Sequence, residues 1–188
     1  AFIPILQEII AAGLKPVVWL FPDDSPDMEK WGEDNRADLK NKMTDFVRIV
    51  DPYVSSYVLG LEIDEYWSLD IAVDLGNHLN TLTRKPIGSH QMPPDSDSGR
   101  NGYSYCVSPF SPWCDMVVLQ YGFGKTELEI IVKTTQVANS AHANGKYFIA
   151  GEYSYQEKAS VGEGLGTAAM GAGADGFGNG CGGANCSR

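Results

Sequence analysis

The chain has 188 residues, which is enough for one domain with a buried core. Its formal net charge of -10 excludes the basic surface that proteins use to bind nucleic-acid phosphates, so we expect no nucleic-acid partner. Its apolar runs are all much shorter than the roughly 20 residues of a membrane-spanning helix, so we expect no membrane partner either.

The first part of the chain predicts a helix followed by a strand. Apolar residues recur at helical spacing from Phe2 to Ala12, and Gly13 lies where a glycine often ends a helix. Residues 17–21 form a short continuous apolar run, typical of a strand buried on both faces. Residues 22–35 are rich in Asp, Glu and Pro, as expected of a loop at the carboxyl end of a strand, where active-site loops lie.

The middle of the chain repeats this alternation. An apolar stripe over residues 39–50 predicts a helix that ends at Asp51-Pro52. Residues 57–63 predict the second strand, and Ser68 can cap a helix that carries apolar residues as far as Leu82. Residues 85–90 form a weaker strand pattern.

The rest of the chain begins with a long polar and aromatic loop over residues 91–113, a length that usually marks a functional or a pinned loop. Further strands and helices follow. We predict a strand at 115–121, a helix from Thr126 that stops at Gly145, a strand at 147–150, a glycine-interrupted helix at 159–170 and a short strand at 174–177.

Four cysteines form two pairs that are close in sequence, Cys106 with Cys114 and Cys181 with Cys186. No histidine is close to either pair, and zinc sites usually have tighter or histidine-containing spacings. We therefore predict two local disulfides and a secreted protein, since disulfides persist in oxidising compartments. Thiols that stay reduced in a cytosol are the alternative.

Apolar strands that alternate with amphipathic helices predict an α/β fold with a parallel sheet built from βαβ units. The sheet could be a barrel or an open doubly wound sheet. Residues 171–176 match GxGxxG, but they follow a helix and precede a strand, which is the wrong order for a nucleotide site. Residues 95–99 are weakly similar to a calcium loop but lack the distal Glu. We expect neither a cofactor nor a metal.

Two strand patterns end in acids. Ile63-Asp64-Glu65-Tyr66 resembles the end of the fourth strand in retaining (β/α)8 glycoside hydrolases, where Asn-Glu supplies the acid/base. Ile149-Ala150-Gly151-Glu152-Tyr153 resembles their seventh strand, which ends in the nucleophile. If the strand at Tyr57 is the fourth, the strand at Tyr147 is the seventh, as the family requires. The resemblance implies that Glu65 is the acid/base and Glu152 the nucleophile.

The sequence departs from this family in three ways. Asp64 replaces the usual Asn, strands one and two are missing, and no helix follows strand eight. We therefore predict one TIM (β/α)8-type barrel domain over residues 1–188 that is incomplete, with strands three to eight visible. Because a barrel cannot close with unpaired edges, the chain is an excerpt, a further polypeptide segment completes it, or the barrel is degenerate.

Hydrolysis with retention needs an acid that protonates the leaving oxygen and a carboxylate that attacks the anomeric carbon, about 5 to 5.5 Å apart. A neighbouring carboxylate helps such an acid to stay protonated, and Asp64 and Glu152 are candidates for that neighbour of Glu65. Glu62 is in phase with Asp64 along the predicted strand, so we expect it to point into the barrel. The residues predicted to contact substrate are Asp64, Trp67, His90, Tyr121, Trp19 and Tyr153.

Each of these residues also has a simpler interpretation. Glu65 and Glu152 could be solvated acids at strand ends, and His90 a structural histidine. The leading functional hypothesis is a secreted retaining glycosidase that acts on an extracellular polysaccharide or oligosaccharide. The alternative is a catalytically inactive barrel remnant that serves as a carbohydrate-binding or structural module of a larger extracellular or viral assembly.

Overall fold

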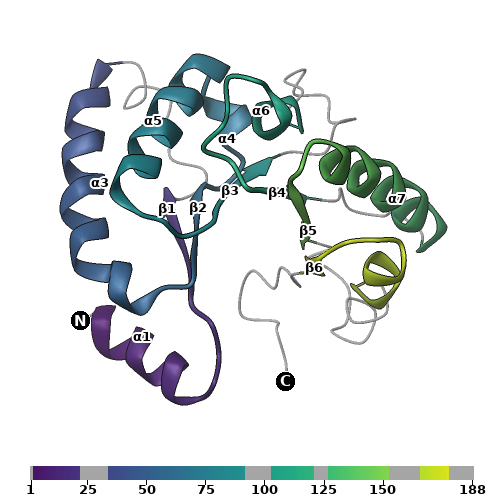
Figure 1. Cartoon of the computed structure of the whole chain (residues 1–188), viewed down its shortest axis with the longest axis horizontal. Helices are drawn as coiled ribbons and strands as arrows, with labels where there is room; N and C mark the ends of the chain where they lie inside the picture. The colour runs from purple at the N-terminus through teal and green to yellow at the C-terminus, as the bar shows by residue number, and fades with distance from the viewer. Residues whose placement is uncertain (1, 22–33, 92–102, 121–126, 153–165, 178–188) are drawn as a thin grey trace.

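The structure is a computed structural model that describes residues 2–21, 34–91, 103–120, 127–152 and 166–177. Within them, six parallel strands form one sheet in which each strand pairs with the next along the chain (Figure 1). The strands are β1 (Val17–Phe21), β2 (Ser56–Gly60), β3 (Ile87–Gln91), β4 (Met116–Gln120), β5 (Tyr147–Glu152) and β6 (Gly176–Phe177).

Helices connect the strands, as parallel pairing requires. In Figure 1, α3 and α5 lie side by side along one flank of the sheet, and α7 lies along the other, beside β5. The helices are α1 (Phe2–Ala11), α3 (Arg36–Val50), η1 (Asp51–Tyr53, a 3-10 turn), α4 (Ile63–Tyr66), α5 (Leu69–Leu82), α6 (Tyr103–Val107) and α7 (Glu127–Ala143). Residues 166–171 are also helical.

The predicted alternation of strands and helices is confirmed. Each of the six predicted strands is present, including the weak pattern that became β3. Gly13 and Gly145 have φ of 77° and 69° and follow α1 and α7, which is the left-handed conformation that glycine allows at a helix end. The bounds differ most at β2, which ends at Gly60 rather than Ile63 because residues 63–66 form the helical turn α4.

The two faces of the sheet differ in their neighbours. Tyr57, Leu59 and Phe148 point to the helices and belong to the main apolar core. Val58 and Val118 alternate with them along β2 and β4, and although each is at most 3% exposed, neither is part of that core cluster. The sheet therefore has a helix-covered outer face and an inner face with a separate set of contacts.

Glycine makes room for large side chains on the inner face. A Cβ atom at Gly88 would lie 3.1 Å from Val118 Cγ2, and one at Gly151 would lie 2.7 Å from Val118 Cγ1. Both distances are shorter than ordinary van der Waals contacts. The methyl groups of Val118 therefore fill the inner face at this point, and β3 and β5 have glycine beside them because a side chain would not fit.

Two aspartates join neighbouring strands at the amino end of the sheet. Asp115 donates its N–H to Ile87 O at 2.7 Å, and its Oδ2 accepts the Ile87 N–H at 3.0 Å. Asp175 makes the same two contacts with Phe148, each at 2.8 Å. We call each of these residues a two-point clamp. Each clamp pairs both backbone groups of a residue near the start of a strand.

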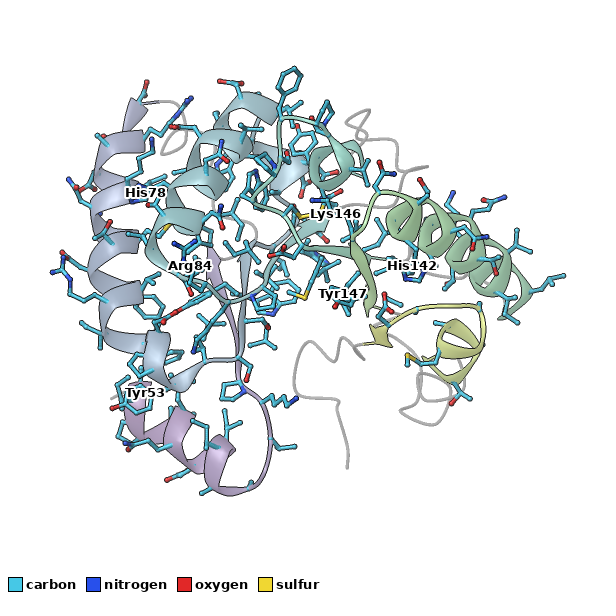
Figure 2. The ribbon with its side chains drawn as sticks, in the orientation of Figure 1. Tyr53, His78, Arg84, His142, Lys146 and Tyr147 are labelled. Carbon is cyan, nitrogen blue, oxygen red and sulfur yellow. A yellow bond between two sulfur atoms is a disulfide. The ribbon has the colours of Figure 1, made fainter. Side chains whose placement is uncertain are left out.

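Lysine and histidine side chains add to the amino end. Lys146 Nζ donates to Cys114 O, and His142 Nε2 lies 2.8 Å from Asp175 Oδ2, which joins α7 to β6 (Figure 2 labels Lys146 and His142). Lys85 Nζ donates to the carbonyl oxygens of Asp51 and Val54. Charged donors on backbone carbonyls therefore tie the loop before β3 to the one before β2, and the loop before β5 to the one before β4.

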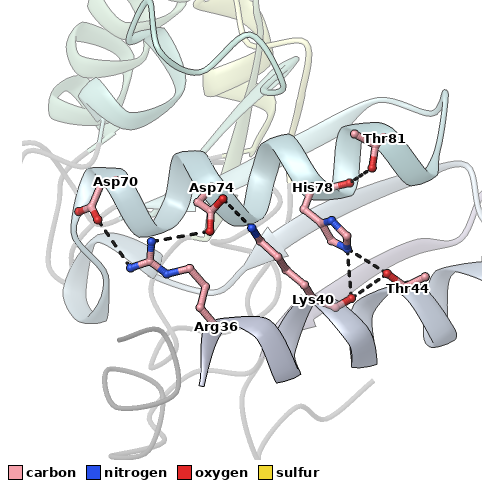
Figure 3. A network of polar contacts seen from close by, with 7 residues as sticks. All are labelled: Arg36, Lys40, Thr44, Asp70, Asp74, His78 and Thr81. Carbon is pink, nitrogen blue, oxygen red and sulfur yellow. Dashed lines mark hydrogen bonds and ion pairs between the residues drawn. The ribbon is translucent and has the colours of Figure 1, made fainter. Parts of the chain in front are cut away.

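A polar network joins α3 to α5 (Figure 3). Arg36 lies 3.6 Å from Asp70 and 3.7 Å from Asp74, and Lys40 Nζ lies 2.6 Å from Asp74 Oδ1. One turn further along, His78 Nε2 lies 2.9 Å from Thr44 Oγ1. These partly exposed pairs fix the relative position of the two helices more than they add stability, since such pairs contribute about 0 to 1 kcal/mol each.

Ser68 occupies the N-cap position of α5, as predicted, but its hydroxyl does not cap the helix. The hydroxyl donates to the Asp70 side chain instead. This hydrogen bond, and then the Arg36 guanidinium, lowers the pKa of the Asp70 carboxyl.

A disulfide joins Cys106 and Cys114, with a Cα–Cα distance of 5.3 Å, which confirms one of the two predicted pairs. It ties α6 to the segment that enters β4. Close by, the Trp113 ring packs on α5 where Gly76 has no side chain, because a Cβ there would lie 2.2 Å from the ring. Cys181 and Cys186 lie outside the described residues.

The described sheet is not a closed barrel. β1 pairs with β2 and β6 pairs with β5, and among the described residues each of these two strands has its other edge unpaired. Val17 on β1 and Tyr147 on β5 are 48% and 58% exposed (Figure 2 labels Tyr147). The predicted α/β fold with a parallel sheet is therefore confirmed, and in the part of the chain that the structure describes this sheet is open.

Candidate functional site

The segment after β2 turns sharply before it presents its acids. Glu62 has φ of 44°, the left-handed conformation that a residue with a side chain seldom adopts. Its carbonyl accepts the Glu65 N–H at 2.8 Å, which closes the first turn of α4. Glu62 was predicted to point into the barrel because it alternates with Asp64 along a strand. The strand ends at Gly60, so this alternation does not reach Glu62.

The two adjacent acids of α4 have different surroundings. Asp64 is 0% exposed, whereas Glu65 is exposed at the surface beyond the strand end. A carboxyl group must be accessible to exchange a proton with a ligand, so Glu65 has the position that acid/base chemistry needs. Asp64 is instead part of the packed base of the turn.

His90, near the end of β3, is completely buried beside this turn. Its Nδ1 accepts the backbone N–H of Glu62 at 3.1 Å. Burial lowers the pKa of His90 from 6.5 to about 3, so the ring is neutral at ordinary pH. Its Nε2 has no hydrogen-bond partner within the described part of the chain.

Trp19 on β1 lies beside His90, with the ring centroids 4.9 Å apart and the planes inclined at 54°. Trp19 is 38% exposed, so part of its ring is free to contact a ligand. An exposed aromatic face next to a buried polar group is the combination that sugar binding requires, because sugars have both apolar faces and hydroxyl groups.

The end of β5 also approaches His90. A Cβ atom at Gly151 would lie 3.3 Å from His90 Cδ2, so the backbone before Glu152 passes close to the imidazole ring. The pairing of β4 with β5 shifts here, since Leu119 pairs with Ala150 but Gln120 pairs with Glu152, leaving Gly151 as an extra residue. Such bulges redirect the end of a strand and are common next to active sites.

The backbones that precede the two predicted catalytic acids therefore both reach one histidine. Glu62 is three residues before Glu65, and Gly151 is one residue before Glu152. Sequence reasoning named Glu65, Glu152 and His90 separately, and the structure joins the three segments through His90. A glycine immediately before an acid at a strand end was the available signal for a close backbone approach.

The remaining predicted residues are placed as follows. Trp67 is 0% exposed and packs edge-on against Phe21, with the centroids 5.1 Å apart, so its ring belongs to the core and does not offer a face to a sugar. Its carbonyl accepts the Tyr105 hydroxyl at 2.7 Å. Tyr121 and Tyr153 lie outside the described residues.

Gln91, at the end of β3, was not predicted as part of any site. It is 0% exposed, and neither its Oε1 nor its Nε2 has a hydrogen-bond partner among the described residues. By strand alternation it points to the opposite face of β3 from His90. Within the described part of the chain, the carboxyl end of β3 thus carries buried polar groups without partners on both faces.

Other kinds of site find less support. Among the described residues, no group of three or more His, Cys, Asp or Glu could hold a metal ion, and residues 95–99 lie outside this part of the chain. No helix in the described segments is both long and apolar enough to span a membrane. A surface hollow of about 260 Å³ between Asp51 and residues 81–85 is at the amino end of the sheet, opposite the acids.

No protein-family model matches the sequence, and no curated protein matches it. Solved structures match its fold. A GH113 β-1,4-mannanase has a TM-score of 0.63 at 14% identity, over 94% of this chain and 66% of the mannanase. The GH53 catalytic domain of Ignisphaera aggregans has a TM-score of 0.63 at 12% identity, over 94% of this chain and 65% of that domain. A GH30 endoxylanase from Clostridium papyrosolvens C71 has a TM-score of 0.51 at 10% identity, over 78% of this chain and 40% of the endoxylanase.

The chain therefore has an α/β fold with a parallel sheet similar to that of TIM-barrel glycoside hydrolases, and it spans just under two thirds of the mannanase and of the GH53 domain. At these identities the likeness concerns the fold. The residues predicted to be catalytic are not tested by it and remain a proposal.

Proposed function

We propose that the protein is a retaining glycoside hydrolase that cleaves O-glycosidic bonds of an extracellular polysaccharide or oligosaccharide. The observation that supports it most is the convergence on His90 of the two backbones that carry Glu65 and Glu152. The likeness to glycoside hydrolase folds supports the same reaction class, and the reaction needs no cofactor.

In this proposal Glu65 protonates the leaving oxygen while Glu152 attacks the anomeric carbon. A covalent glycosyl-enzyme forms as the glycosidic bond breaks, and Glu65 then removes a proton from the water that releases the sugar. The exposure of Glu65 supports its role, since it must exchange protons with both leaving group and water.

We assign the sugar contacts to Trp19 and His90, with Tyr121 and Tyr153 kept as predictions. Trp19 offers a partly exposed ring for stacking, and His90 a polar nitrogen beside it. The burial of Asp64 favours a role in holding the turn rather than the predicted contact with substrate. Trp67 is left out of the proposed site for the same reason.

A mechanism-based 2-fluoro glycoside tests this proposal, because it stops the reaction at the covalent intermediate. The full chain is incubated with 2-fluoro glycosides of β-linked mannose, xylose, glucose and galactose, and the labelled peptide is identified by mass spectrometry. We expect one label, on Glu152, and no label in the Glu152→Gln variant. Glu8→Gln, at an exposed site on α1, is the control and should label like the native protein.

The proposal fails if none of these reagents labels the protein, or if the label is on another carboxylate. A second candidate would then take its place, namely a carbohydrate-binding or structural module without catalysis. The open edges of β1 and β6 favour it, since an incomplete barrel can keep a binding surface while it lacks a complete site. Binding of β-1,4-mannan or xylan without labelling or hydrolysis is the result that this candidate predicts.

We further propose that the protein acts outside the cell and that another polypeptide segment pairs with the open edges. The Cys106–Cys114 disulfide is compatible with an oxidising compartment. Among the described residues, β1 and β6 each have one unpaired edge, which is what a sheet looks like where further strands would continue it. Measurement of the mass of the native protein against the 20.4 kDa of this chain tests the second point.

A further inference from the structure

We infer that His90 is a positioning residue: it acts as the neutral tautomer with its proton on Nε2, and its Nδ1 holds the turn that presents Glu65. This inference deepens the proposed function and rests on it for the role of Glu65. The arrangement of His90 itself follows from the contacts of the ring and requires no assumption about the reaction.

The hydrogen bond from Glu62 determines which nitrogen of His90 carries the proton. The hydrogen bond between Glu62 and His90 has a backbone N–H as its donor, so Nδ1 must offer a lone pair. A protonated imidazole has none, and a neutral ring with its proton on Nδ1 has none at that atom either. The 3.1 Å contact therefore requires the neutral ring with the proton on Nε2. The complete burial of His90 favours the same neutral form.

The same hydrogen bond also holds the turn at Glu62. The left-handed conformation of Glu62 is disfavoured for any residue with a side chain, so surrounding contacts must hold it. Its peptide groups are held on both sides, because its N–H donates to His90 and its carbonyl accepts the Glu65 N–H. Without the His90 contact, the backbone of Glu62 would no longer be held on its amino side, and Glu65 would lose its fixed position.

His90 also lies beside the strand end that precedes Glu152. The ring of His90 occupies the space next to Gly151, where a Cβ would lie 3.3 Å from it. One ring thus accepts a hydrogen bond from the turn before Glu65 and lies close to the strand end before Glu152. His90 lies on the inner face beside Trp19, while its Nε2–H has no partner in the described part of the chain. Since a buried donor without a partner is costly, we expect a water or a ligand oxygen to accept from it.

Two variants separate the nitrogen atoms of His90. The side-chain oxygen of His90→Asn can reach the place of Nδ1 and accept the Glu62 N–H, but nothing replaces Nε2. The longer side chain of His90→Gln places its amide near Nε2 and leaves Nδ1 without a substitute. If His90 acts through Nδ1, the Asn variant keeps the turn and the Gln variant loses it.

The direct readout is hydrogen exchange of the Glu62 amide, measured by NMR without any substrate. We expect this amide to be protected in the native chain and in His90→Asn, and to exchange at least about tenfold faster in His90→Gln, as loss of one buried hydrogen bond implies. For the substrate that the labelling experiment identifies, kcat should be lowered more by Gln, which loses the turn, and KM should be raised more by Asn, which loses the Nε2 contact with the sugar.

The tautomer is measured on the native chain, so the test does not depend on whether a variant folds. Two-bond and three-bond proton–nitrogen correlations of the His90 ring should show a proton on Nε2 and none on Nδ1. A protonated Nδ1, or equal Glu62 exchange in both variants, would overturn the inference. Neither readout uses a sugar. If the protein proves to have no hydrolase activity, the proposed function is refuted, but the positioning role of His90 is still decided by these two measurements.

Discussion

The two ends of the sheet differ in how their backbone is held. At the amino end, the clamps of Asp115 and Asp175 pair the backbone groups of Ile87 and Phe148, at the start of β3 and β5. At the carboxyl end, Glu62 has a left-handed backbone, and His90 and Gln91 keep buried polar atoms without partners among the described residues. We therefore expect substitutions at the amino end to lower stability and substitutions at the carboxyl end to lower the proposed activity, the division of roles found in TIM barrels.

The largest effect is expected from a substitution at the carboxyl end that lowers activity and leaves the amino end unchanged. Glu65→Gln should lower kcat/KM by about 10²- to 10⁴-fold, because an amide cannot donate and regain the proton. Its unfolding free energy should change by less than about 0.5 kcal/mol, since Glu65 is exposed. Hydrolysis rates and denaturant unfolding check the two parts, with Glu8→Gln as the control. Unchanged hydrolysis by Glu65→Gln would remove Glu65 from the mechanism.

The next effect concerns the dependence of stability on pH. His90 has a folded-state pKa of about 3 against 6.5 for the free side chain, so below pH 6.5 the unfolded chain binds a proton that the folded protein does not. Stability should therefore fall as the pH falls through this window, by about 1.4 kcal/mol per pH unit at most, and His90 should contribute nothing above it. Between pH 6.5 and 5 the loss is about 2 kcal/mol.

Denaturant unfolding of the native chain and of His90→Asn at pH 6.5, 6 and 5 measures this contribution as a difference of slopes. The variant lacks the titrating ring, so its stability should fall less over the same range. Equal slopes would mean that His90 becomes protonated in the folded protein, and the neutral ring at the centre of the site would be excluded.

A smaller effect is expected at the amino end. Asp115→Ala removes the acceptor of the Ile87 N–H and should lower the unfolding free energy by about 1 to 2 kcal/mol. Asp115→Asn keeps an acceptor oxygen and should cost less. At a temperature where both variants are folded, kcat should equal that of the native protein. A large loss of kcat in folded Asp115→Ala would show that the two ends are not separable.

The smallest effect is expected on the outer surface of α3. Lys42 and Asp38 form an exposed pair with 2.7 Å between Nζ and Oδ2. Asp38→Asn should change the unfolding free energy by no more than about 0.5 kcal/mol and leave hydrolysis unchanged. Thermal unfolding of this variant beside Asp115→Ala shows whether stability depends on the ends of the strands, and a larger loss in Asp38→Asn would contradict this.

Much of the fold could be predicted because the pattern is local. The apolar runs that became β1, β4 and β5, and the glycines after α1 and α7, are visible in the sequence. The end of β2 was not predictable, because the turn at Glu62 depends on His90, which lies 28 residues away. Burial of Trp67 against Phe21 could not be read from the sequence for the same reason.

The site was predicted as residue types, and its geometry was not. Glu65, His90 and Glu152 follow from strand ends and a resemblance, but the contact of Gly151 with His90 depends on a register shift between β4 and β5. Sequence alternation assumes a regular strand and therefore misses a bulge.

Rescue by azide tests the central claim that Glu65 and Glu152 act on one anomeric carbon from different sides. An aryl glycoside of the sugar found by labelling is incubated with Glu152→Ala or Glu65→Ala and sodium azide, and the glycosyl azide products are identified by NMR. We predict an inverted azide from Glu152→Ala and a retained azide from Glu65→Ala, because azide takes the place of the nucleophile in the first and of the activated water in the second. The same configuration from both variants, or no azide product from either, would contradict the account.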